Sequence, residues 1–103
     1  MLIARWQIDA RFGHKQAVIE MVRQWGEDVA PKIGWTAEKG RMLTGSIGAR
    51  EATVVHEWSI PDLGDLERAW AALGKLAAHA EWGKALEPHV VSGSSRWEVY
   101  RVV

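Results

Sequence analysis

Two histidines are the side chains of this sequence best suited to move a proton. His56 lies in a segment of alternating apolar residues, and His79 lies in a later segment with helical spacing. An imidazole changes charge near neutral pH and can accept or donate a proton at a ring nitrogen. We therefore predict His56 and His79 as the candidate catalytic residues. The structural alternative is a hydrogen-bonded core residue for His56 and a helix-surface residue for His79.

The surroundings of His56 bear on its charge. It alternates with Val54 and Trp58, so all three side chains are expected on one face of a strand. Apolar neighbours disfavour the charged form of an imidazole. We expect His56 to be neutral and able to accept a proton near pH 7.

Seven tryptophans in 103 residues are the second unusual feature. Large aromatic rings often fill a core, but a tryptophan can pack and wall a ligand pocket at the same time. We predict a pocket walled by Trp6, Trp58, Trp70 and Trp82. If these rings fill the space instead, a structural role is favoured.

A third group is polar and belongs to the strands. Arg5 can neutralise Glu57 or Glu98, and an unpaired buried charge would cost several kcal/mol. We predict a polar interior between two sheets, formed by Arg5, Gln7, Glu57, Glu98 and Tyr100. The functional alternative is an anchor for an acidic or phenolic ligand.

Other chemistry has little support in the sequence. The histidines at 14, 56, 79 and 89 lack the spacing of metal ligands, and cysteine is absent. No phosphate loop or Ser-His-Asp order occurs. We predict no metal and no other cofactor. Thirteen basic and thirteen acidic residues cancel without a basic cluster, so no nucleic-acid partner is expected.

The candidate residues lie on a regular series of strands and helices. Period-two alternation predicts strands, and spacing of three and four residues predicts helices. The expected order is strand Leu2 to Asp9, helix His14 to Ala30, strand Arg41 to Gly48, strand Ala52 to Ile60, a helix after Pro61-Asp62 with the buried stripe Leu63, Leu66, Trp70 and Leu73, helix Ala77 to Leu86, and strand Ser95 to Val103.

This order predicts one α+β domain over residues 1–103, with the ferredoxin-like βαββαβ pattern. A four-stranded antiparallel sheet is expected, with helices covering the face that bears Trp6 and Trp58. The other face would carry the predicted polar residues Arg5, Gln7, Glu57, Glu98 and Tyr100 together with apolar side chains. Such a face is too polar for a dry core and too apolar to be fully exposed to solvent. We therefore expect a homodimer whose sheets close into an α/β barrel.

With these elements placed, the chain resembles the dimeric α/β-barrel superfamily, and most of all its NIPSNAP-like and antibiotic-biosynthesis-monooxygenase-like domains. The matching pieces are Phe12-Gly13-His14-Lys15 before a helix, His56-Glu57-Trp58 at the end of a strand, and Ala80-Glu81-Trp82 leading to Pro88. The resemblance implies homodimers with a pocket between sheet and helices in each subunit. It also implies a range of roles, among them cofactor-free oxygenases, haem-degrading oxygenases and domains without a known activity.

Haem degradation ranks last among these roles. The resemblance implies an asparagine on the first strand, a tryptophan, and a histidine ligand on the later helix. Trp70 and His79 are near the expected places, but Trp6 occupies the asparagine position, with Gln7 beside it. A bulky ring there replaces a polar group and enters the haem space.

The function expected from the sequence is binding of a small molecule, with two alternatives kept. One is a cofactor-independent oxygenase, or related small enzyme, acting on a compact aromatic or polyketide-like compound. The other is a non-catalytic ligand-binding or structural dimerisation domain. We expect a cytoplasmic protein without a membrane partner, because no run of about 18 apolar residues and no signal-peptide core is present.

Overall fold

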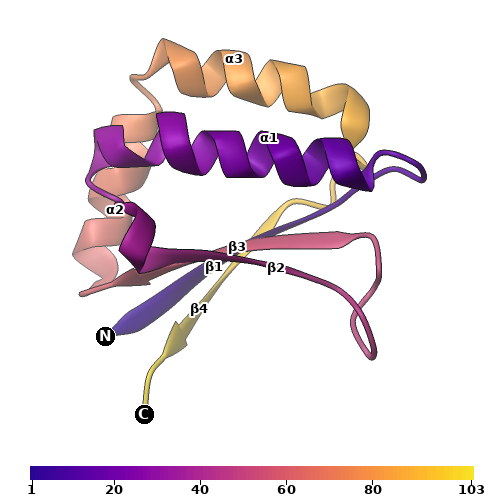
Figure 1. The fold of residues 1–103 in the computed structure, drawn as a ribbon. Coiled ribbons are helices and arrows are strands. Elements are labelled where there is room, and N and C mark those ends of the chain that lie inside the picture. The colour runs from indigo at the N-terminus through magenta and orange to yellow at the C-terminus, as the bar shows by residue number, and fades with distance from the viewer.

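The computed structural model describes residues 1–103, and its elements follow the expected order. The strands pair antiparallel in the order β2-β3-β1-β4, and all three helices cover one face of the sheet (Figure 1). The elements are β1 Leu2–Asp9, α1 Lys15–Asp28, β2 Gly40–Thr44, β3 Thr53–Ile60, α2 Leu63–Leu73, α3 Ala77–Leu86 and β4 Arg96–Arg101, with 3-10 turns η1 Ala30–Ile33, η2 Ala37–Lys39 and η3 Glu87–His89. The ferredoxin-like α+β prediction is therefore confirmed.

Strand register decides which side chains share a face. Trp6 on β1 lies opposite His56 on β3 and opposite Trp97 on β4. Residues directly opposite each other in an antiparallel pair project from the same face. The central strand and its two neighbours thus present these three rings together under the helices. Arg5, one position away, lies opposite Glu57 and Glu98 on the other face.

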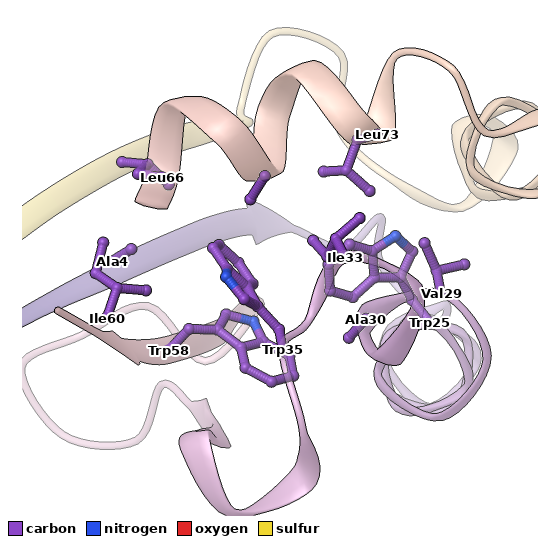
Figure 2. Close-up of a cluster of buried hydrophobic side chains, with 11 residues drawn as sticks. Ala4, Trp25, Val29, Ala30, Ile33, Trp35, Trp58, Ile60, Leu66 and Leu73 are labelled. Atoms are coloured by element: carbon purple, nitrogen blue, oxygen red, sulfur yellow. The ribbon is translucent and has the colours of Figure 1, made fainter. Parts of the chain in front are cut away.

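The helix-covered face carries the hydrophobic core. As the spacing predicted, α1 buries Val18, Val22 and Trp25 toward the sheet. Figure 2 shows one part of the core, in which Trp25, Trp35 and Trp58 lie between the strands and the helices. None of the helices has the length and apolar character needed to cross a membrane.

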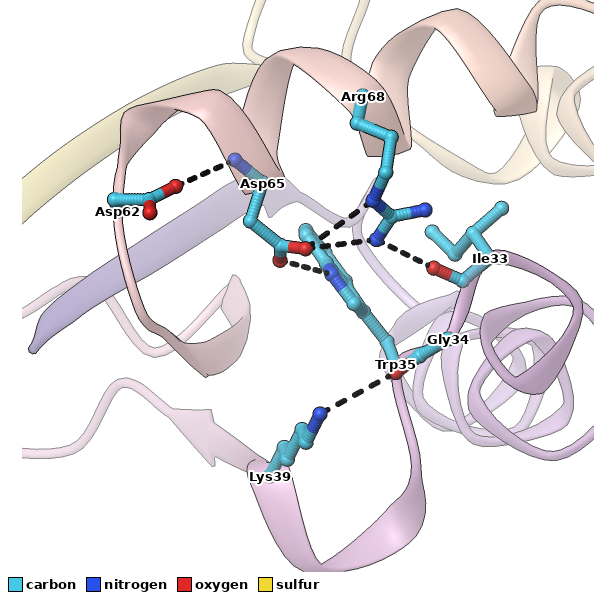
Figure 3. Close-up of polar contacts among 7 residues, drawn as sticks. All are labelled: Ile33, Gly34, Trp35, Lys39, Asp62, Asp65 and Arg68. Atoms are coloured by element: carbon cyan, nitrogen blue, oxygen red, sulfur yellow. Dashed lines mark hydrogen bonds and ion pairs between the residues drawn. The ribbon is translucent and has the colours of Figure 1, made fainter.

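The segment between α1 and β2, to which the sequence assigned no helix or strand, contains the two 3-10 turns η1 and η2. The helix ends at Asp28, and the chain continues in η1 to Gly34, whose φ of 82° is favourable only for glycine. This tight turn directs Trp35 inward, where 1% of its surface is exposed. Its indole N–H donates to Asp65 at 3.1 Å, and Arg68 joins Asp65 to the carbonyl oxygen of Ile33 (Figure 3).

The buried side of α2 differs from the sequence prediction. In α2 the residues facing the sheet are Leu66, Ala69 and Leu73, whereas Leu63 is 60% and Trp70 44% exposed. Successive helix residues are about 100° apart, so Leu63 and Trp70 lie to the side of the buried line.

The strand β2 is shorter than predicted. It ends at Thr44, because Gly45 begins a loop that folds back on itself. A Cβ at Gly45 would lie 1.6 Å from the carbonyl oxygen of Arg50, so only glycine permits this close approach.

Candidate ligand-binding cavity

A cavity of about 340 Å³ lies between the sheet and the helices. Six of the seven tryptophans and two histidines form most of its wall. Its size falls within the range of small-molecule sites, roughly 300–1,000 Å³. The lining residues are Trp6, Val22, Trp25, His56, Trp58, Trp70, Leu73, Gly74, His79, Trp82 and Trp97.

The structure brings together every residue that the sequence suggested for a site on this face. The strands supply Trp6, His56 and Trp58, while Trp70 comes from α2 and His79 and Trp82 come from α3. The four predicted tryptophans line the cavity without filling it. Their role in binding stays a prediction.

His56 is the more deeply placed of the two histidines. Only 6% of its surface is exposed, and burial lowers its pKa from the usual 6.5 to about 4. Its ring is therefore neutral at pH 7. The ring lies 4.5 Å from the Trp58 ring, centroid to centroid. A Cβ added at Gly26 of α1 would come within 3.1 Å of Cε1 of His56, so this glycine leaves room for the imidazole.

The hydrogen-bonded core role considered for His56 has no support in its contacts. No side chain or backbone group makes a hydrogen bond with the ring, yet no fully buried side-chain nitrogen in the protein lacks a partner. Both ring nitrogens therefore keep some accessible surface. His56 also lines the cavity.

His79 is held in a different way. The indole N–H of Trp25 donates to Nδ1 of His79 at 3.0 Å. Burial lowers the pKa of His79 as well. Its ring stacks on Trp82 at a centroid distance of 6.2 Å and an interplanar angle of 19°. His79 is thus a half-buried cavity residue, and the helix-surface alternative is wrong.

Trp25 is the hub of the aromatic wall. Its ring lies about 6 Å from the rings of His56, Trp58, His79 and Trp82, largely in edge-to-face geometry. Such contacts are favourable beyond the area they bury. Trp25 therefore touches both candidate catalytic histidines.

Hydrogen bonds to indole nitrogens hold other walls in place. The N–H of Trp82 donates to the carbonyl oxygen of Met21, and that of Trp6 to Oγ of Ser95, both at 2.8 Å. At the rim, Trp70 packs edge-on against Trp97 at 5.5 Å. The cavity therefore has walls whose positions are fixed by packing and by hydrogen bonds.

The predicted polar group lies on the opposite face of the sheet and takes no part in this cavity. Glu57, 4% exposed, pairs with Arg5 at 3.0 Å and with Arg41 through its other oxygen. Burial tends to raise the pKa of Glu57, but the hydrogen bonds and charges of the two arginines lower it below its usual value. Gln7 donates to Glu98, and Arg5 lies 4.9 Å from the centre of the Tyr100 ring.

Sequence reasoning missed several participants. Trp25, Trp35 and Trp97 were not named as residues of the site. Trp35 packs against Trp58, with ring centroids 5.3 Å apart. Nor did spacing reveal that His14 and His89 meet, with their Nδ1 atoms 3.0 Å apart. No group of three or more side chains that could hold a metal ion occurs in the structure.

The comparisons with known proteins bear on the fold. No family model matches the chain, and no curated protein matches its sequence. Among solved structures, a NIPSNAP family protein from Agrobacterium tumefaciens superposes with a TM-score of 0.79 at 19% identity, covering 99% of this chain and 92% of that one.

Two oxygenase-type structures share the fold at greater distance. SnoaB, a cofactor-independent oxygenase from Streptomyces nogalater, matches with a TM-score of 0.68 at 12% identity over 98% of this chain and 91% of its own. An antibiotic biosynthesis monooxygenase matches with a TM-score of 0.69 at 12% identity over 100% and 99%. The chain therefore has the fold of NIPSNAP and antibiotic-monooxygenase-type domains, as its sequence resemblance predicted. At these identities the likeness extends to the fold alone.

Proposed function

We propose that this protein binds a compact aromatic molecule in the tryptophan-walled cavity. The observation that carries the proposal is the cavity itself, which has ligand size, fixed aromatic walls and two histidines. Flat apolar rings gain free energy when they leave water and contact indole faces. A purely structural domain would gain more from covering these rings, because apolar surface left in contact with water contributes no burial free energy.

The test is a thermal-shift screen of naphthols, phenols, aromatic acids and haem against wild type, His56→Ala and His89→Ala. A ligand that binds the folded state raises the unfolding temperature by mass action. We expect a phenolic hit that stabilises wild type and His89→Ala but not His56→Ala. A hit unaffected by His56→Ala would move the site elsewhere, and no hits would favour the structural role.

A second candidate function is cofactor-independent oxygenation, and the unpartnered imidazole of His56 on the cavity wall favours it. Because burial lowers the pKa of His56, it is a weak base, and the proton that it removes must be an acidic one. Such a base can take a proton from an acidic CH₂ group flanked by aromatic rings. The resulting carbanion gives its electrons to O₂. In the balanced reaction the CH₂ group becomes a carbonyl, one oxygen atom stays in the product, and the other leaves as water.

Oxygen uptake with an anthrone tests this second candidate. Turnover should require O₂ and wild-type His56, and His56→Gln should lower the rate at least tenfold. Binding without oxygen uptake by any such compound would leave the non-catalytic role in place.

We also propose that the protein is a homodimer in which the open sheet faces meet. That face carries the ion pairs of Glu57 beside exposed apolar side chains such as Leu43 and Tyr100. Its positive and negative groups are balanced, so a second copy offers complementary charge. A stable interface of this kind would bury at least about 1,200 Å² in total.

A further inference from the structure

The polar groups of the cavity set the charge of what can enter it. Its only ionisable side chains are His56 and His79, and no lysine, arginine, aspartate or glutamate lines it. Burial lowers the pKa of both imidazoles, which favours their neutral forms. An ionised carboxylate or ammonium in this cavity would lose its water without gaining a charged partner, which is strongly unfavourable. The wall therefore favours uncharged ligands.

His79 has only one hydrogen-bonding role left. An indole N–H can only donate, so the 3.0 Å contact with Trp25 requires an unprotonated Nδ1 on His79. The proton of the neutral ring must then be on Nε2. Because its acceptor is already occupied, His79 can offer a ligand a donor and nothing else.

The ring nitrogens of His56, unlike Nδ1 of His79, are not occupied by hydrogen bonds within the protein, and both keep accessible surface. A neutral imidazole has one donor and one acceptor nitrogen. The acceptor for a ligand proton is thus confined to His56, because the Nδ1 acceptor of His79 is occupied by Trp25. His79 supplies a fixed donor for a ligand oxygen, and the second nitrogen of His56 is a further donor. Trp25 contacts both rings, at centroid distances of 5.9 Å to His56 and 6.2 Å to His79.

We propose that the cavity selects uncharged ring compounds that carry a carbonyl-type oxygen, bound by Nε2–H of His79, and a hydroxyl or comparably acidic proton, bound by His56. Trp25 acts as the positioning residue that keeps His79 in its donor form. This inference rests on the proposed binding function and gives it a ligand class. It also assigns a chemical task to Trp25, beyond packing.

Four bicyclic compounds of similar size test the ligand class: a hydroxytetralone, a tetralone without the hydroxyl, a tetrahydronaphthol without the carbonyl, and a tetrahydronaphthoate that carries a charge. Quenching of tryptophan fluorescence reports their affinities. We expect the hydroxytetralone to bind best and each single deletion to weaken binding about 3- to 10-fold, the worth of one neutral hydrogen bond. The carboxylate should bind weakest at pH 7.

Variants assign each ligand group to its residue. In His79→Phe, removal of the carbonyl should no longer weaken binding, while removal of the hydroxyl should weaken it as in wild type. His56→Phe should show the reverse pattern. Trp25→Phe removes the indole N–H, so the difference in affinity between the hydroxytetralone and the tetrahydronaphthol without the carbonyl should shrink. In the matched control Trp6→Phe, the affinities for these two compounds should change by the same factor.

A direct measurement covers the case in which Trp25→Phe fails to fold. Long-range proton–nitrogen NMR of wild-type protein with labelled histidine distinguishes the two neutral tautomers, and we expect the proton of His79 on Nε2. A proton on Nδ1 would overturn the role of Trp25. Binding of the carboxylate as tight as that of the hydroxytetralone would overturn the ligand class. Failure of all four compounds to bind would instead contradict the proposed function, and the tautomer would still test the Trp25 contact.

Discussion

Replacing His56 should change how stability depends on pH. The pKa of this residue falls from 6.5 to about 4 on folding because the ring is buried. The unfolded chain therefore binds a proton more readily than the folded protein below pH 6.5. Stability is lost as pH falls from about 6.5 toward 4, since the proton drives unfolding in that window.

The magnitude follows from the two pKa values. Each pKa unit is worth 1.36 kcal/mol, so the free energy of unfolding is about 3 kcal/mol lower below pH 4 than at neutral pH. About 2 kcal/mol of this decrease occurs between pH 7 and pH 5. This upper window is the informative one, because ordinary carboxylates remain ionised there. His79, whose pKa is also lowered by burial, adds a loss of the same sign.

Urea unfolding monitored by tryptophan fluorescence provides the assay, at one protein concentration and at pH 7 and pH 5. Between pH 7 and pH 5, the free energy of unfolding should fall by about 2 kcal/mol more in wild type than in His56→Phe. Only the difference with pH matters, so any constant cost of the substitution cancels. An equal loss in wild type and His56→Phe would refute a buried, neutral His56.

Three further predictions concern the fold and the assembly. Val22→Asp should destabilise the protein by at least about 3 kcal/mol, because it buries an unpaired charge. Arg23→Asp changes the next residue, on the exposed side of α1, and should change the urea midpoint little. Equal effects of the two substitutions would contradict the assigned helix face. Asp65→Leu should cost about 1–3 kcal/mol, because the buried indole N–H of Trp35 loses its acceptor; an unchanged midpoint would contradict this contact. Light scattering at micromolar concentration should give twice the 11.5 kDa chain mass, and a monomer that keeps its full near-UV signal on dilution would disprove the dimer.

Much of the fold was predictable because it depends on local periodicity. Alternation in β1 and β3 placed Trp6, His56 and Trp58 on one face and Arg5 and Glu57 on the other, and the observed register agrees. Alternation alone left the parity of β4 open, and the observed register shows that Trp97 lies opposite Trp6 on the helix-covered face. These assignments need only the side-chain period of a strand and one buried face.

The errors lie where position depends on tertiary contacts. Trp35 follows a turn, and no period there indicates that it points inward to Asp65. The side of α2 that meets the sheet is set by how that helix is rotated, which a stripe of four apolar residues did not determine. For the same reason Trp70 was expected to be buried and instead lies at the rim of the cavity.

The candidate site was predictable in its residue types but not in its contacts. Sequence spacing placed His56 under the helices, and His79 was named because of its chemistry and its place in the family resemblance. Nothing in the sequence indicated that the indole N–H of Trp25 would reach Nδ1 of His79, since the two residues are 54 positions apart. This contact gives His79 a hydrogen-bonding role different from that of His56, which the sequence did not indicate.

The use of tryptophan in this chain favours a binding role over a purely structural one. A domain of about 100 residues buries a modest fraction of its surface, so its largest apolar side chains matter most for stability. Here six of the seven tryptophans border an unfilled cavity. Trp82 and Trp6 are anchored at their nitrogens, by Met21 and Ser95, so that their rings cannot simply collapse inward. Stability gained from a ligand would compensate for the space that this arrangement leaves open.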